Sequence, residues 1–394
     1  MKRNYSIFIA VAAVALIIAL LAGPNSLVRS AAAQGKTPSK APQFEVDPLW
    51  PKPLPNHWVL GSVTGVAVDA QDHIWIVHKG ASSLGNMEKG GILTPPTGCC
   101  IPAPQVLEFD SSGDLLAHWG GPGQGFDWPQ STGGMAVDPK NNVWITAAGQ
   151  SQAAAATPNR PQGEAPPQDA QVIKFSGSGQ FFMQIGHAGK IGSSDQALLN
   201  RPAAVAVDSA GNEVYIADAG NRRIVVFDAG TGAFKRQWGA YGDKPEEADP
   251  GKYDPNASPA KQFRDVSCVK LAKDGLVYVC DRQSDRLQVF QKDGKFVKEA
   301  FVSKSTLGDG SVWDVAFSSD PKQQFLYIAD GQDKKVWVLR RDTLEVVTSF
   351  GDGGRLPGHF YGVGSIAVDS KGNVYTGETY EGKRVQKFVY KGLK

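Results

Sequence analysis

The chain has 394 residues, of which 41% are hydrophobic and 20% are charged, so it can bury a core and is not a disordered protein. With 41 Lys+Arg against 39 Asp+Glu the formal net charge is only +2, and no basic run is present, which argues against a nucleic-acid surface. The 45 Gly and 25 Pro are high for a helical protein and favour many short strands joined by turns.

The N-terminal segment has the pattern of a secretory signal peptide. Two basic residues precede an apolar run over residues 7–22, and three alanines at 31–33 supply the small residues of a cleavage site. We therefore predict a signal peptide over residues 1–33, a linker over residues 34–43 and export to the periplasm or the cell exterior. An uncleaved membrane anchor is the less favoured alternative, because the run is short for a bilayer span.

The rest of the chain repeats one phrase six times: an apolar strand ending in Val-Asp or an equivalent, a Gly/Asn turn, and a strand led by an aromatic residue. The copies lie at residues 65–78, 134–147, 204–218, 268–281, 314–330 and 365–378. Each copy is followed by a third strand and usually by a fourth. Alternating short strands with Gly/Asp turns indicate antiparallel sheet. Four strands in each repeat of roughly 50–60 residues predict an all-β, six-bladed β-propeller over residues 44–394.

The sixth repeat lacks a fourth strand, because the chain stops at Lys394 soon after its third strand. An N-terminal strand can take that place, and residues 44–46 or residues 58–60 are the two candidates. Such a closure pairs the two ends of the chain and removes an exposed sheet edge. The last blade is therefore predicted to be closed by an N-terminal strand.

The four cysteines leave two alternatives open at each pair. Cys268 and Cys280 lie symmetrically about a turn, so they either form a cross-strand disulfide or remain buried thiols. Cys99 and Cys100 either form a vicinal disulfide or are loop thiols. No C-x-x-C pair is present, so neither a thioredoxin-type site nor a zinc ribbon is supported.

The segment RPAAVAVDSAGNEVYIADAGNRRIVVFD (201–228) resembles an NHL repeat, and the resemblance covers nearly all of the chain after residue 33. Among NHL propellers, the enzymes that the sequence resembles most are the peptidyl-α-hydroxyglycine α-amidating lyases. These cleave an N–C bond of a hydroxyglycine peptide with a zinc ion held by three histidines from alternate blades. The resemblance places the zinc ligands at Gly133, Ser267 and Gly364, none of which can bind zinc as an imidazole does.

Two further positions follow from the same resemblance. One arginine of the lyases corresponds to Lys79, which keeps the charge but lacks the planar fork that binds a carboxylate. Another is retained as Arg282. Lys79 and Arg282 are therefore the candidate catalytic residues if a carbon–nitrogen lyase activity survives, although the lost histidines lead us to expect that it does not.

The loop lengths single out one face of the predicted propeller. The turns between first and second strands are tight, whereas the long insertions fall between second and third strands or between blades, at one end of the channel. The first residue of each innermost strand should point into the channel mouth at that end. Counting back from the Val-Asp positions, these residues are Thr64, Gly133, Ala203, Ser267, Trp313 and Gly364.

We predict a binding site at this mouth. Thr64, Ser267 and Trp313 would line it, and Lys79 and Arg282 would add positive charge, which suits an anionic, carboxylate-bearing or peptidic ligand.

Two other candidates, His78 and Asp281, end second strands. Acids recur at this position, so either they form a ring that binds Ca²⁺ or each accepts backbone N–H groups of its own turn between the second and third strands. They are Asp218, Asp281, Asp330 and Glu378.

The sequence thus predicts an exported, monomeric propeller that binds a small ligand, a peptide or a protein through its long-loop face. We predict no cofactor, with zinc or calcium as the alternatives. A lyase with a relocated or abandoned metal site is the alternative function.

Overall fold

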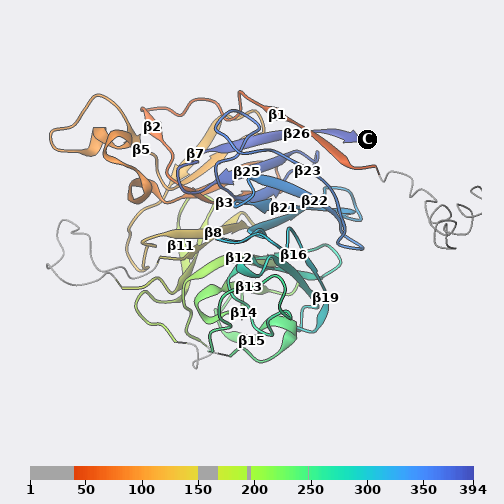
Figure 1. Cartoon of the computed structure of the whole chain (residues 1–394). Coiled ribbons are helices and arrows are strands. Elements are labelled where there is room, and N and C mark those ends of the chain that lie inside the picture. The colour runs from red at the N-terminus through yellow and green to blue at the C-terminus, as the bar shows by residue number, and fades with distance from the viewer. Residues whose placement is uncertain (1–39, 150–166, 193–196, 247) are drawn as a thin grey trace, which may run out of the picture. The chain divides into compact units, whose positions relative to one another are not determined.

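Six four-stranded antiparallel sheets, here called blades, make up the computed structural model (Figure 1). The model describes residues 40–149, 167–192, 197–246 and 248–394. The predicted signal peptide and most of the predicted linker lie outside these residues. Within the described residues, no helix has the length and hydropathy that a bilayer span requires.

The first three blades follow one another along the chain. Blade one contains β3 (Val63–Val68), β4 (Ile74–His78), β6 (Val106–Phe109) and β7 (Leu115–Trp119). Blade two contains β8 (Thr132–Val137), β9 (Asn142–Ala147), β10 (Gln171–Ser176) and β11 (Phe181–Gly186). Blade three contains β12 (Pro202–Asp208), β13 (Glu213–Asp218), β14 (Arg223–Asp228) and β15 (Phe234–Trp238).

The other three blades complete the ring. Blade four contains β16 (Val266–Leu271), β17 (Val277–Asp281), β18 (Arg286–Phe290) and β19 (Phe296–Phe301). Blade five contains β20 (Asp314–Phe317), β21 (Phe325–Asp330), β22 (Lys335–Arg340) and β23 (Val346–Phe350). Blade six contains β24 (Val363–Val368), β25 (Val374–Glu378), β26 (Val385–Leu393) and β1 (Pro42–Asp47).

Short 3₁₀ helices occupy the loops. They are η2 (Gly80–Ser83), η3 (Asn86–Glu88), η4 (Gly90–Ile92), η5 (Ala219–Asn221), η6 (Ala240–Gly242) and η7 (Arg282–Ser284). The first strands of the six blades contact one another in a closed ring, in the order β3, β8, β12, β16, β20, β24 and back to β3. This ring surrounds the channel, and the all-β, six-bladed prediction is confirmed.

The repeated Val-Asp phrase has a direct physical role. One oxygen of Asp69 accepts hydrogen bonds from the backbone N–H groups of Gln71 and His73, which forms the tight turn after the first strand. The other oxygen accepts the indole N–H of Trp75 at 2.9 Å. Asp138 and Asp369 bind their own turns and the aromatic residue six positions later in the same way. The aspartate therefore fixes both the turn and the buried aromatic ring that packs between blades.

The sixth blade is closed as predicted, by the first of the two candidate segments. β1 pairs antiparallel with β26, and Ala41 and Lys394 exchange backbone hydrogen bonds of 2.8 and 3.1 Å (Figure 1). The strand begins at Pro42, within the segment predicted to be linker. The second candidate segment instead forms β2 (Trp58–Val59), which pairs in parallel with β5 (Ile101–Pro102).

Both cysteine pairs are disulfide-bonded. Cys268 and Cys280 face each other across β16 and β17, with their Cα atoms 4.9 Å apart. Cys99 and Cys100 form a vicinal disulfide in the loop between β4 and β6. Of the two alternatives that the sequence left open, the structure has the disulfide in each case.

The stability of the closed sixth blade should depend on Phe44, the residue of β1 whose ring packs against blade five. Its ring lies 4.8 Å from that of Phe350 and 5.4 Å from that of Tyr327, centroid to centroid. We expect Phe44→Ala to lower the free energy of unfolding by roughly 2 kcal/mol, because these apolar contacts to blade five are lost. Chemical denaturation would measure the change, with Phe182→Ala on the exposed side of β11 as the control. Equal effects of the two substitutions would contradict an anchoring role.

Candidate functional site

The six residues that the sequence places at the channel mouth do meet there. Thr64, Gly133, Ala203, Ser267, Trp313 and Gly364 all line one hollow of about 190 Å³. Five of the six have a β-bulge in common: the pairing of the first strand with the second skips a residue, as between Val63 and Gly65 or between Val266 and Cys268. The skipped residue is turned out of the ladder and toward the channel. Blades three and six have the same register shift, and blade two skips two residues. In blade five, Trp313 directly precedes β20.

Lys79 lies at this mouth as a half-buried cation. Its backbone N–H is bound to the carbonyl of Ser62, which fixes where the side chain starts. Burial lowers the pKa of the ammonium group below that of an ordinary lysine. Within the described part of the chain, this ammonium has no hydrogen-bond acceptor and no carboxylate partner. Lys79 is therefore a charge without a counter-charge.

Arg282 lies at the same mouth in a different state. Its guanidinium binds the Asp265 carboxylate through Nε at 2.9 Å and Nη2 at 2.5 Å. It also stacks on the indole of Trp313, 4.4 Å from the ring centroid. Trp313 is itself fixed, because its indole N–H donates to the carbonyl of Gly310 at 2.7 Å. Arg282 therefore forms one wall of the mouth, and the carboxylate of Asp265 balances its charge.

The ring hydroxyls make hydrogen bonds within the protein. Ser267 Oγ donates to the carbonyl of Val312 at 3.1 Å. Thr64 Oγ1 lies 3.1 Å from Thr132 Oγ1. Each hydroxyl therefore keeps acceptor capacity toward the mouth but is not a free nucleophile with a base beside it.

His78 and Asp281 do not line the mouth; both are fully buried inside their blades. His78 accepts the backbone N–H groups of Gly61 and Gly80 at Nδ1, and its Nε2 lies 2.9 Å from the carbonyl oxygen of Pro104. Asp281 accepts the N–H groups of Arg264 and Asp265 and binds Arg286. Their hydrogen bonds are used within the fold, so we remove both from the candidate site.

The recurring acids are buried and accept backbone N–H groups, but among the four only Asp330 accepts those of its own turn after the second strand, as the second alternative predicted. Asp218, Asp281 and Glu378 instead bind the segment that precedes the first strand of their blade. Blade two has Ala147 at the same position, and Asp169 from the following loop supplies the carboxylate to the N–H groups of Gln130 and Ser131. These groups tie down the segments at the rim instead of forming an open ring of cation ligands.

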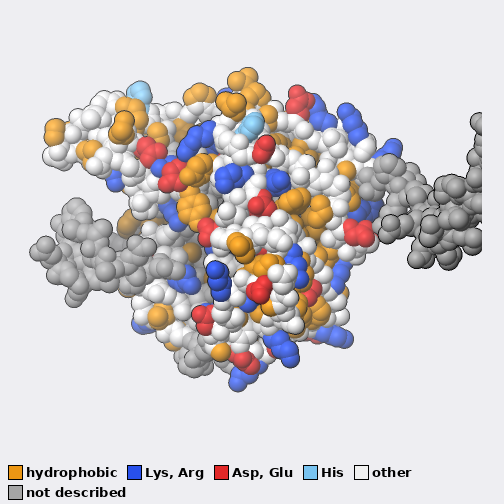
Figure 2. Space-filling view, in the orientation of Figure 1, with side chains coloured by type: hydrophobic (Ala, Val, Ile, Leu, Met, Phe, Trp, Pro, Cys, Tyr) orange, Lys and Arg blue, Asp and Glu red, His pale blue; other side chains and the backbone are white. Residues whose placement is uncertain are grey.

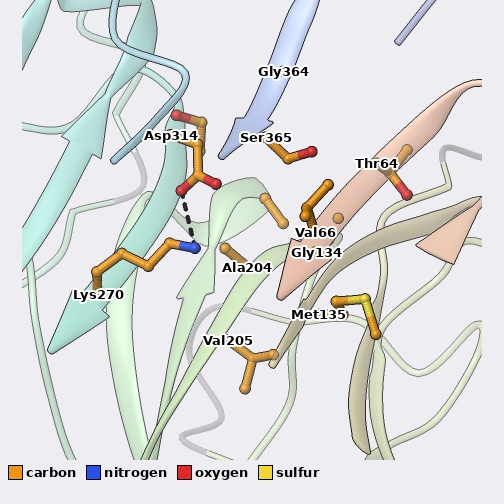
Figure 3. A pocket seen from close by; sticks show the side chains of 13 residues that line it. Thr64, Val66, Gly134, Met135, Ala204, Val205, Lys270, Asp314, Gly364 and Ser365 are labelled. Atoms are coloured by element: carbon orange, nitrogen blue, oxygen red, sulfur yellow. Dashed lines mark ion pairs between the residues drawn. The ribbon is translucent and has the colours of Figure 1, made fainter. Parts of the chain in front are cut away.

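Sequence reasoning missed a charged pair deeper in the channel. Lys270 Nζ lies 3.2 Å from Asp314 Oδ1, and both side chains border a hollow of about 30 Å³ (Figure 3). Burial raises the pKa of the Asp314 carboxyl, and the neighbouring Lys270 opposes that shift. A signal was available, because Lys270 stands where each of the other five repeats has alanine. The pair bridges blades four and five beneath the mouth.

One cluster of metal-binding side-chain types occurs in the described residues, away from this mouth. Asp69, His73 and Glu108 lie close together at the turn that follows β3, with His73 Nδ1 2.8 Å from Glu108 Oε1. This turn is at the other end of β3 from Thr64. The hydrogen bonds of Asp69 to its turn and to Trp75 explain its position.

Comparison with known proteins agrees with this architecture. Residues 199–227 match the model of the NHL repeat family. The chain is a six-bladed β-propeller that contains an NHL repeat. It is 24% identical over 330 residues to peptidylglycine alpha-amidating monooxygenase of Rattus norvegicus, a match that spans 81% of this chain but 30% of that protein. It is 26% identical over 310 residues to NHL repeat-containing protein 3 of Mus musculus, over 78% of this chain and 70% of the relative.

A solved structure of streptogramin B lyase shares the fold. It superposes with a TM-score of 0.50 at 11% identity, over 88% of this chain and 98% of that chain. At this identity the likeness shows the architecture and not the activity.

The residues at the lyase zinc positions do not fit that metal. Gly133, Ser267 and Gly364 lie at the mouth, and no histidine of the chain lines it. A Cβ on Gly133 would lie 2.3 Å from Thr146 Oγ1 and 3.1 Å from the carbonyl oxygen of Ala203, so this position has no room for an imidazole. Among the described residues that line the mouth, Asp265 has the only carboxylate, and Arg282 binds it.

The buried His78 generates a pH prediction. Burial lowers the pKa of its imidazole from 6.5 to about 4. Between these values the unfolded chain binds a proton that the folded chain does not, so this residue makes stability fall as the pH drops, by about 3 kcal/mol in all. We expect His78→Gln, which cannot take up the proton, to lose less stability than the unmodified protein between pH 7 and pH 4. Denaturation curves along that range measure the difference.

His118→Gln on the exposed side of β7 is the control for this experiment, because its side chain is not buried. Parallel pH curves for His78→Gln and the unmodified protein would contradict a neutral, buried imidazole.

Proposed function

We propose that this NHL propeller binds a small anionic ligand, a carboxylate above all, in its channel mouth through Lys79. The observation that carries the proposal is the half-buried ammonium without a counter-charge. Taking a cation out of water is unfavourable unless a partner compensates, so such a group favours an anion that enters the hollow. Buried ionisable groups with shifted pKa values in a cleft also mark functional sites more often than other surfaces.

The charge balance of the mouth supports an anion. Its ionisable lining consists of Lys79, Arg282 and Asp265. Since Asp265 is paired with Arg282, one positive charge is left over, and it belongs to Lys79. On the face shown in Figure 2, charges of both signs are interspersed.

The walls of the mouth suit recognition more than catalysis. Ser131 and Thr379 also border this hollow, and their hydroxyl groups can donate hydrogen bonds to the oxygens of a carboxylate. The ring has neither the imidazoles that would hold a catalytic zinc nor a nucleophile beside a base. We therefore propose a binding protein and not an amidating lyase.

We also propose that the protein acts outside the cytoplasm. The signal-like pattern of residues 1–33 supports this proposal. Two disulfide-bonded cysteine pairs are consistent with an oxidising compartment.

The binding proposal predicts a large effect of Lys79→Met. Removing the ammonium should weaken binding of a test carboxylate such as acetate or benzoate by at least tenfold, because a charged hydrogen bond contributes about 1.5–3 kcal/mol. Lys79→Arg should retain binding, and Lys140→Met in the exposed turn after β8 is the control. Isothermal titration calorimetry measures the affinities. Unchanged affinity in Lys79→Met, or no binding of any carboxylate, would refute the proposal.

The lowered pKa of Lys79 predicts a pH dependence of the same binding. Only the protonated ammonium attracts an anion, so affinity should fall as the pH rises, and it should fall at a lower pH than an ordinary lysine would cause. Titrations in a series of alkaline buffers measure this fall.

The lyase alternative is tested separately. Stoichiometric zinc in protein purified without chelator, together with cleavage of a hydroxyglycine peptide, would replace the binding proposal.

A further inference from the structure

A second and larger hollow adjoins the channel mouth. It has a volume of about 510 Å³ and lies between the loop that follows β4 and the segment that joins blades one and two. Lys79 borders both hollows. We call the second hollow the side groove; its lining residues are Trp58, residues 79–82, residues 102–105, Gly120, Pro122 and residues 128–130.

The side groove presents flat apolar surfaces. Trp58 and Trp128 contribute two indole rings, and four prolines contribute rings without N–H donors: Pro102, Pro104, Pro122 and Pro129. The indole N–H of Trp128 is already used, because it donates to Gln105 Oε1 at 2.6 Å. The amide nitrogen of Gln105 lies 3.4 Å from the carbonyl oxygen of His78. These polar atoms are therefore bound within the protein. Each indole also packs against rings of the protein, Trp58 against His118 and Trp128 against Phe126 and Phe175, and both still line the groove.

The backbone keeps the indole of Trp128 in this position. Gly120 has φ of +118°, and a Cβ there would lie 3.1 Å from Trp128 Cη2. A side chain at Gly120 would push against the ring. The glycine thus allows the chain to pass close beside the groove wall.

The volumes of the two hollows and the position of Lys79 between them suit one ligand that occupies both. Small-molecule sites usually measure about 300–1,000 Å³. The mouth, at about 190 Å³, accommodates a headgroup, whereas the side groove is large enough for the body of a ligand. Among the residues that line the side groove, Lys79 is the one that carries a charge. A ligand that fills both hollows would place its anionic group at Lys79 and an uncharged, flat body along the indoles.

We propose that the ligand is an aryl carboxylate: its carboxylate group contacts Lys79 at the mouth and its aromatic body lies in the side groove against Trp58 and Trp128. This inference rests on the proposed function of the mouth and adds the chemical class of the ligand. Aromatic rings stack favourably on indoles and prolines, and the side groove has no second charge that would favour a sugar phosphate or a dicarboxylate.

Matched pairs of carboxylates test the side groove. Acetate is compared with phenylacetate, and butyrate with 4-phenylbutyrate, by calorimetric titration of the full-length protein. We expect the phenyl group to raise affinity by about tenfold in each pair, because it buries apolar area against the indoles. We expect Trp58→Ala to remove most of this gain while acetate and butyrate bind as before. Lys79→Met should weaken all four ligands.

A second variant makes the test independent of the folding of Trp58→Ala. Pro122→Glu places a carboxylate at an exposed position of the groove wall and should also remove the gain from the phenyl group, with Pro53→Glu, exposed and outside the groove, as its control. Equal affinities within each pair, or a phenyl gain that survives Pro122→Glu, would overturn the inference about the groove. Binding of acetate that depends on Lys79 would still support the mouth in that case. Failure of all four ligands to bind would refute the proposed function itself.

Discussion

A buried acceptor at the end of the second strand is the interaction on which the rim of this propeller depends. In blade four the Asp281 carboxylate holds the two N–H groups that directly precede β16. These hydrogen bonds fix the residue at which the loop ends and the strand begins. The β-bulge that follows then turns one side chain toward the channel axis. Where the carboxylate is missing, another group takes over the same N–H bonds, as His78 and Asp169 do. Five blades have this interaction, although the residue that makes it changes; in blade five Asp330 binds the turn after its own strand instead.

This interaction also explains why the mouth is small and regular while the loops around it are long. The long segments begin and end at residues whose backbone is held, so their length does not disturb the ring. The ring itself has small side chains in five blades and an indole, that of Trp313, in blade five. Function is therefore concentrated in the few residues that depart from the repeat, among which Lys79 lies where the two hollows meet.

The two cations at the mouth show how similar residues acquire different roles from their surroundings. Arg282 is stacked and paired, so it shapes the site and adds little net charge. Lys79 has the same formal charge but faces no carboxylate in the described structure. An arginine can be held at the mouth in this way, because its planar guanidinium group both stacks on an aromatic ring and forms paired hydrogen bonds. The ammonium group of a lysine has no flat face for such stacking.

Most of the fold and part of the site could be predicted from the sequence, for a physical reason. The Val-Asp aspartate is bonded to its own turn, so its position marks the strand, and counting back from it located all six residues at the mouth. The partners of His78 and Asp281 could not be predicted, because their N–H groups come from segments whose course the repeat does not determine. The contribution of Asp169 was missed for the same reason: it comes from a loop, not from the repeated strand. Lys270 could have been found, since it replaces an alanine shared by the other repeats.

The pairing of β1 with β26 has a consequence for how the molecule is made. The two strands are separated by nearly the whole chain, so β26 has to be synthesised before β1 can complete the sixth blade. Until then blades one and five each lack a neighbour, and the nascent polypeptide keeps an open edge. The ring can therefore close only late in the synthesis of these six blades.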